Sequence, residues 1–171
     1  MNSGILILRL AIGLTLSYHG TQKLFGWFGG YGLKGTSGFM LSLGFGKRAA
    51  FMAGMAETFG GLFLALGLAT PAAAAVIFSV MLVASVTVHL KNGFSIAKTG
   101  YEYTMVLGLS ALSLAFIGPG RFSLDAVLDI ARSGWMWGLG AFLVGAAGGG
   151  LQIAMRKAPA PAAAPVPAAA K

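Results

Sequence analysis

Long apolar runs constrain the fold of this chain more than any other feature. Five stretches approach the roughly 20 residues that an α-helix needs to cross the hydrocarbon core of a bilayer. They are Ile5 to Gln22, Ala49 to Ala69, Pro71 to Leu90, Tyr103 to Ile117 and Trp135 to Met155. We therefore predict an all-α fold, a polytopic bundle of transmembrane helices in which the fifth, glycine-rich span is an addition to a four-helix core.

The composition agrees with lipid as the main solvent. Of 171 residues, 57% are hydrophobic and 9% are charged, whereas soluble domains carry about 25% charged residues. The net charge of +8 does not indicate nucleic acid, because the basic residues stand singly at the ends of apolar runs and form no stripe. We expect them to contact anionic lipid headgroups and to set the topology of the chain in the bilayer.

The basic residues also predict the orientation of the spans. Five crossings place one set of basic residues on one side, which should be the cytoplasmic side: Lys23, Lys34, Lys47, Arg48, Lys91, Lys98, Arg156, Lys157 and Lys171. The other side has only Arg121 and Arg132, partly offset by two aspartates. We expect a multi-pass protein of the bacterial inner membrane with its N-terminus outside and its C-terminus inside.

The segments between the spans carry turn and interface signals. Thr70 and Pro71 leave room only for a tight hairpin between the second and third spans. The glycine- and aromatic-rich loop from Phe25 to Lys47 suits the headgroup layer. Ser123 should cap a short amphipathic helix that runs through Arg132. The Ala/Pro-rich residues 158–171 should form a disordered tail.

Ionisable residues inside the spans are the candidate functional residues. Charges at bilayer depth are expensive and usually have a partner inside the bundle. We expect Glu57, on a face with Gly60 and Gly61, to be the counter-ion of Arg9 or His19, and the remaining polar groups to close the cytoplasmic mouth. The candidate cluster is Arg9, His19, Lys23, Glu57, His89 and Glu102.

Two interpretations of this cluster remain open. It can be structural, a set of ion pairs and hydrogen bonds that fixes helix order, or it can bind a polar head such as a quinone carbonyl and exchange protons. A metal site is not expected, because the histidines lack ligand spacing. The chain has no cysteine and no dinucleotide or haem motif, so a partner or a diffusible cofactor must supply electrons.

Four segments resemble the bacterial DoxX family of small integral membrane proteins. They are LRLAIGLTLSYHGTQKLFG, AETFGGLFLALGLATP, MLVASVTVH and GYEYTMVLGLSALSLAFIGPGRFSLD, which together extend from about Leu8 to Leu128. The resemblance implies a four-helix membrane domain over residues 1–132, followed by an additional helix over 133–157 and the tail. It also brings forward a set of family-pattern positions: Arg9, His19, Gly20, Lys23, Glu57, Gly60, Gly61, His89, Glu102, Gly118, Pro119, Gly120 and Asp125.

The resemblance leaves two functions open. Members of this family act as subunits of membrane oxidoreductase systems, including a thiosulfate:quinone oxidoreductase, and distant eukaryotic relatives act as receptor chaperones and cargo receptors. The first hypothesis is therefore a quinone-associated subunit with a redox partner protein and no covalently bound cofactor. The second is a non-catalytic membrane scaffold or chaperone, in which the cluster fixes helix packing and exposed glycine ladders and loops bind a partner. The small-residue ladders of the fifth span suit packing against another helix, within the chain or in a dimer.

Overall fold

The chain folds into a bundle of helices. A computed structural model describes residues 2–46 and 48–157, and every regular element within these ranges is helical, as the sequence predicted. The longer helices are α1 (Asn2–Phe25), α2 (Gly32–Ser42), α3 (Ala49–Leu66), α4 (Thr70–Ala84), α5 (Glu102–Ile117) and α7 (Trp135–Ala154). The shorter elements are η1 (Trp27–Gly29), η2 (Ser85–His89), η3 (Leu90–Asn92), η4 (Ile96–Lys98) and α6 (Leu124–Val127).

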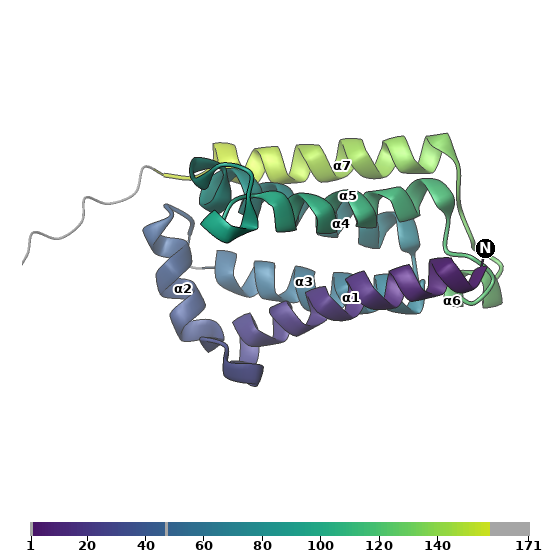
Figure 1. The fold of residues 1–171 in the computed structure, drawn as a ribbon, viewed down its shortest axis with the longest axis horizontal. Coiled ribbons are helices and arrows are strands. Elements are labelled where there is room, and N and C mark those ends of the chain that lie inside the picture. The colour runs from purple at the N-terminus through teal and green to yellow at the C-terminus, as the bar shows by residue number, and fades with distance from the viewer. Residues whose placement is uncertain (1, 47, 158–171) are drawn as a thin grey trace, which may run out of the picture.

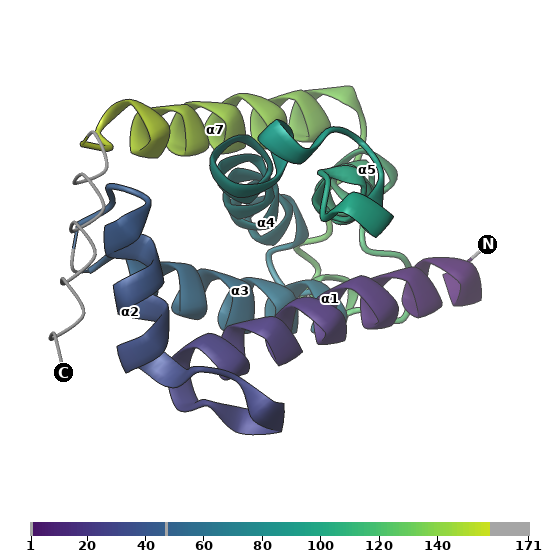
Figure 2. The same cartoon turned by 60° about the vertical axis from the view of Figure 1, so that its left-hand side comes forward.

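The long helices form two layers. Helices α1 and α3 pack against each other in one layer, and α4, α5 and α7 form the other (Figure 1). Helix α4 contacts α3, α5 and α7, so it joins the layers (Figure 2). One end of the bundle holds α2 and the C-terminal ends of α1, α4 and α7. We call it the basic end, because Lys23, Arg48 and Lys157 lie there. The opposite end holds the N-terminus and α6 (Figure 1).

Glycines allow α1 and α3 to approach closely. The two helices run antiparallel, so that Gly13 faces Gly61 and Gly20 faces Gly54. A Cβ atom added to Gly61 would lie 2.7 Å from the backbone nitrogen of Ser17, a distance at which the helices would have to move apart. The face of α1 that carries Gly13 and Gly20 is therefore a helix interface.

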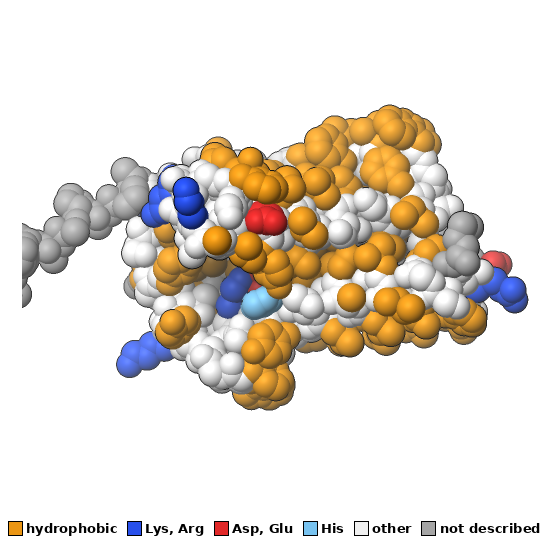
Figure 3. All heavy atoms as spheres, viewed as in Figure 1, with side chains coloured by type: hydrophobic (Ala, Val, Ile, Leu, Met, Phe, Trp, Pro, Cys, Tyr) orange, Lys and Arg blue, Asp and Glu red, His pale blue; other side chains and the backbone are white. Residues whose placement is uncertain are grey.

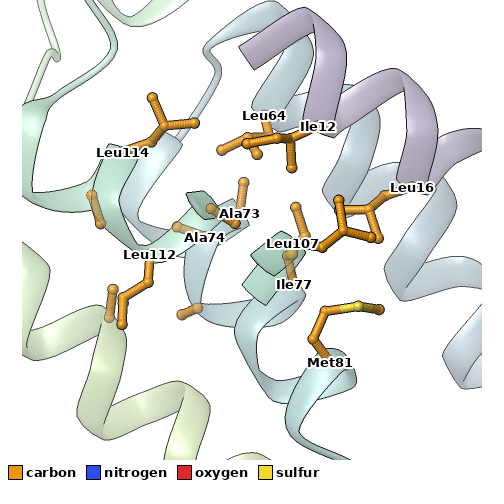
Figure 4. Close-up of a cluster of buried hydrophobic side chains, with 14 residues drawn as sticks. Ile12, Leu16, Leu64, Ala73, Ala74, Ile77, Met81, Leu107, Leu112 and Leu114 are labelled. Atoms are coloured by element: carbon orange, nitrogen blue, oxygen red, sulfur yellow. The ribbon is translucent and has the colours of Figure 1, made fainter. Parts of the chain in front are cut away.

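The apolar core lies where the two layers meet. Leu16 of α1, Leu64 of α3, Ile77 of α4 and Leu107 of α5 point toward one another (Figure 4). The first three are at most 1% exposed, and Leu107 is 8% exposed. These residues fix the relative positions of the four helices, three of which carry five of the six candidate residues: α1, α3 and α5.

The hairpin between α3 and α4 is as tight as predicted. Gly67 ends α3 in the left-handed conformation (φ 65°), and Pro71 lies in the first turn of α4. Proline suits this position because the first helical N–H groups have no intrahelical acceptor.

Helix α7 packs on α4 and α5. Its small residues Gly138, Ala141, Gly145 and Gly149 are buried, and a Cβ atom on Gly145 would lie 2.7 Å from the carbonyl oxygen of Ala75. The small residues of the fifth span therefore pack against α4 and α5 of the same chain. The sequence had left open whether they pack there or in a dimer.

Two segments differ from the sequence predictions. The segment from Phe25 to Lys47, expected as a loop, contains the 11-residue helix α2, which packs on α1 and α3. Helix α6 begins after the Ser123 cap as predicted but ends at Val127, because Asp129 adopts a positive φ of 56° and the backbone leaves the helix well before Arg132. The predicted disordered tail lies outside the described residues.

The surface and the helix lengths are those of a membrane protein. Hydrophobic side chains cover most of the length of the bundle, and basic side chains gather at its ends (Figure 3). In the described ranges, four helices are long and apolar enough to cross a membrane: α1, α3, the stretch Thr70–Asn92 and α7. Helix α5 has 16 residues, so it is about 24 Å long, somewhat shorter than a hydrocarbon core of about 30 Å.

Candidate functional site

A cavity of about 140 Å³ lies at the basic end, between α3 and α4. Most of its lining is apolar and comes from α3, α4 and the segment around α2, including Met40, Phe45, Met52, Ala53, Val80 and Ala84. Four polar side chains also line it: Lys23, Glu57, Thr87 and Gln152. An apolar cavity with a few convergent polar groups is the usual form of a small-molecule site.

The charged group of the cavity is an ion pair between α1 and α3. Lys23 Nζ donates a hydrogen bond to Glu57 Oε1. The Glu57 side chain is 2% exposed and that of Lys23 is 29% exposed. The second carboxylate oxygen, Glu57 Oε2, is buried and has no hydrogen-bond partner among the described residues. The site therefore holds a buried acceptor that a ligand could satisfy.

The antiparallel packing of α1 and α3 brings Lys23 and Glu57 together. Glu57 lies on the face of α3 that carries Gly60 and Gly61, and these three residues are buried, as the sequence predicted for this face. Gly54, about one turn before Glu57, is buried as well. Gly54 contacts the side chains of Leu24 and Lys23. Lys23, expected from the sequence to help close the mouth of the cluster, lies directly beside the buried carboxylate.

His19 lies one helical turn before Lys23 on α1. Its Nδ1 is 3.1 Å from Gln22 Oε1, and its Nε2 is 3.2 Å from the Tyr103 hydroxyl of α5. The histidine therefore links α1 to α5. Basic, acidic and histidine side chains are visible together in the seam between the two layers (Figure 3).

His89 and Glu102 hold the loop between α4 and α5. His89 Nδ1 donates to the carbonyl oxygen of Thr99 over 2.7 Å, and Glu102 Oε2 accepts from the backbone N–H of Ile96 over 2.8 Å. Neither residue lines the cavity. Both shape the loop at the basic end, and η2, which precedes it, contributes Thr87 to the cavity as part of a π-helical turn.

Glu57 pairs with Lys23, so the expected pairing with Arg9 or His19 was wrong. Because α1 and α3 are antiparallel, Arg9 lies beside Gly67 at the opposite end of α3. Its guanidinium donates to the carbonyl oxygens of Pro119 and Phe122 and is acted on by the charge of Asp125. Arg9 is 1% exposed, and it holds the 118–125 turn against the bundle.

Sequence reasoning missed two polar residues with clear roles. Asp125 is 1% exposed and accepts hydrogen bonds from the backbone N–H groups of Ala69 and Thr70 and from the Thr70 hydroxyl, over 2.7 to 2.9 Å. The sequence placed Asp125 in the predicted amphipathic helix after Ser123, and the family resemblance brought it forward without a role. Gln152 lines the cavity, and a lone amide within an apolar span was the available signal.

The cavity opens toward the basic end. A wider hollow of about 530 Å³ shares Phe45, Ala49 and Met52 with it, and the hollow is bordered by Arg48 and Lys157. The backbone N–H of Lys157 donates to the carbonyl oxygen of Gly44 over 2.9 Å, so the end of α7 is fastened beside this opening.

The chain is similar to one family of known proteins. The family model described as DoxX matches residues 4–90, a range that includes Lys23 and Glu57 but not α7. A protein of Bacillus subtilis (strain 168) named "Putative oxidoreductase CatD" is 30% identical over 122 residues, which make up 71% of this chain and 84% of that relative. No solved structure matches the chain at a comparable level of significance.

Proposed function

The chain belongs to the DoxX family, and from that premise we propose that it is the membrane subunit of an oxidoreductase system and binds the ring of a quinone in the cavity beside Glu57. One observation carries this proposal: a ring-sized apolar cavity is lined by Glu57, whose carboxylate has one buried oxygen without a partner among the described residues. The name of the Bacillus subtilis relative supports the oxidoreductase part.

The dimensions and the chemistry of the cavity fit a quinone ring. Its volume of about 140 Å³ is close to that of an engineered apolar cavity of about 150 Å³ that holds benzene. The apolar walls suit the faces of a ring. Lys23 can donate a hydrogen bond to a ring carbonyl, and Glu57 Oε2 can accept one from the hydroxyl group of the reduced form.

Glu57 is also placed to exchange protons. Reduction of a quinone takes up two protons with two electrons, and the carboxylate can pass protons between the ring and the hollow beside Arg48 and Lys157. The electrons come from an external donor, since the chain has no cysteine and no dinucleotide or haem motif. We therefore propose a redox partner protein at the basic end.

The second hypothesis, a non-catalytic scaffold, has less support. The glycine ladder that would bind a partner is occupied by α4 and α5. A packing role alone also leaves Glu57 Oε2 without an explanation, because buried polar atoms in native proteins nearly always have a partner.

Filling the cavity tests the proposal. In Ala53→Phe a phenyl ring takes the proposed ring site, so we expect at least tenfold weaker binding of ubiquinone-1 to the purified full chain, measured by calorimetry in detergent. Ala11→Phe, at an exposed position of α1, is the matched control and should stay within twofold. Failure of the unmodified protein to bind ubiquinone-1 would contradict the proposal, and so would unchanged binding by a folded Ala53→Phe protein.

We also propose that the basic end faces the cytoplasm of a bacterial cell, which places the N-terminus outside and the C-terminus inside. Green fluorescent protein fused after Lys171 should therefore fluoresce, and alkaline phosphatase at the same site should be inactive. A phosphatase fused after Arg132, in the loop before α7, should be active. The reverse pattern in both fusions would invert the orientation, and activity at both sites would mean that α7 does not cross.

A further inference from the structure

A shallow groove of about 340 Å³ runs along the bundle beside the cavity. Helix α4 forms its floor through small residues that include Ala72, Ala75 and Ser79, while Val144 and Gly148 of α7 form one wall. The lining is mainly apolar, and most of its residues do not line the proposed ring site. The groove lies along membrane-spanning helices, so it opens to lipid.

The groove adjoins the cavity. Ala56, Val80 and Gln152 line both, and the amide of Gln152 marks the place where they meet. From Val80 the floor follows α4 back to Ala72, a distance of about 12 Å at the rise of an α-helix. The cavity with its ion pair and the groove without one therefore lie side by side, and together they offer a head compartment and a chain compartment.

We propose that the groove binds the hydrocarbon tail of the quinone whose ring lies beside Glu57. This inference rests on the proposed function and narrows its substrate class to lipid-soluble quinones with an isoprenoid tail, which enter from the bilayer. Two features favour this occupant. First, the groove starts where the ring would end. Second, small residues line its floor, and such residues allow a neighbouring group to approach a helix backbone closely.

Binding of the tail does not depend on removing apolar surface from water, because the tail comes from the bilayer. Lipid tails are as apolar as the groove, so the tail contributes by packing against α4 and α7 and by orienting the ring. Blocking the groove should therefore affect tailed quinones and spare a quinone that lacks a tail.

The test compares two quinones on matched variants of the full chain. Gly148→Leu places a branched side chain in the groove, where an added Cβ meets only the Ser79 side chain, at 3.3 Å or more. Gly150→Leu, two residues further along α7 with no atom within 4 Å of an added Cβ, is the control. We expect Gly148→Leu to weaken the binding of ubiquinone-2 at least tenfold and to change the binding of ubiquinone-0 by less than twofold. The control Gly150→Leu should not show this loss of ubiquinone-2 binding. Partition of each quinone into detergent cancels when variants are compared with the unmodified protein.

Each outcome separates the two proposals. If ubiquinone-0 and ubiquinone-2 bind the unmodified protein but Gly148→Leu affects them equally, the tail lies elsewhere and the groove proposal fails while the ring site stands. If neither quinone binds the unmodified protein, the proposed function fails as well. Should Gly148→Leu not fold, Val144→Trp fills the same wall from an exposed position (67%) and carries the same expectations.

Discussion

Asp125→Asn should lower the free energy of unfolding by about 3 to 5 kcal/mol, because hydrogen bonds to a buried charged group are worth about 1.5 to 3 kcal/mol each. The carboxylate accepts three hydrogen bonds at the start of α4 and is the negative charge that acts on Arg9. An amide replaces one accepting oxygen with a donor that faces other donors, and it leaves the Arg9 guanidinium buried without an opposite charge.

The effect should appear in unfolding curves of the purified protein in one detergent, with Asp129→Asn as the matched control. Asp129 is exposed and adopts a positive φ of 56°, a conformation that asparagine tolerates, so its change should stay within about 0.5 kcal/mol. Equal stabilities of the two variants would mean that Asp125 does not hold the turn against the bundle.

The helices could be predicted from the sequence because apolar run length is a local property. The five predicted spans all form helices, and the glycine-bearing faces around Gly13 and Gly61 are buried as expected. The tight hairpin at Pro71 could be predicted for the same reason, because it depends on the residues of the turn itself. These features need no knowledge of which helices touch.

The pairing of charges could not be predicted in the same way, because it depends on the register between helices. Arg9 and Glu57 both lie inside spans, but antiparallel packing of α1 and α3 places them at different ends of the interface. The Arg9 site depends on Gly67, whose left-handed conformation and missing Cβ leave space for the guanidinium. The Asp125 site depends on a turn about 55 residues away in sequence from the helix start that it caps.

Tertiary packing also overrode local composition in α2. Three glycines at positions 32, 35 and 38 argued for a loop, since glycine costs about 1 kcal/mol in a helix interior. The helix forms where α1 and α3 provide a surface, and Thr36 is buried there and donates to the carbonyl oxygen of Lys23 over 3.3 Å.

A double-mutant cycle on Lys23 and Glu57 should reveal strong coupling. Lys23→Met leaves a carboxylate that is 2% exposed without its partner, and we expect a loss of about 2 to 3 kcal/mol, below the full buried-pair value because water reaches Lys23. Glu57→Gln should cost only about 1 kcal/mol, since the flexible lysine can extend to the surface. The double variant should recover most of the larger loss, because no buried charge remains.

The same cycle on Arg9 and Glu57 separates the observed register from the one expected from sequence. Residues far apart without shared partners give additive effects within about 0.5 kcal/mol, whereas contacting residues depart from additivity by more. Arg9→Met and Glu57→Gln should therefore add, although each removes a buried charged group. Coupling between Arg9 and Glu57, with additivity between Lys23 and Glu57, would require a different register of α1 on α3 and would move the carboxylate away from the cavity.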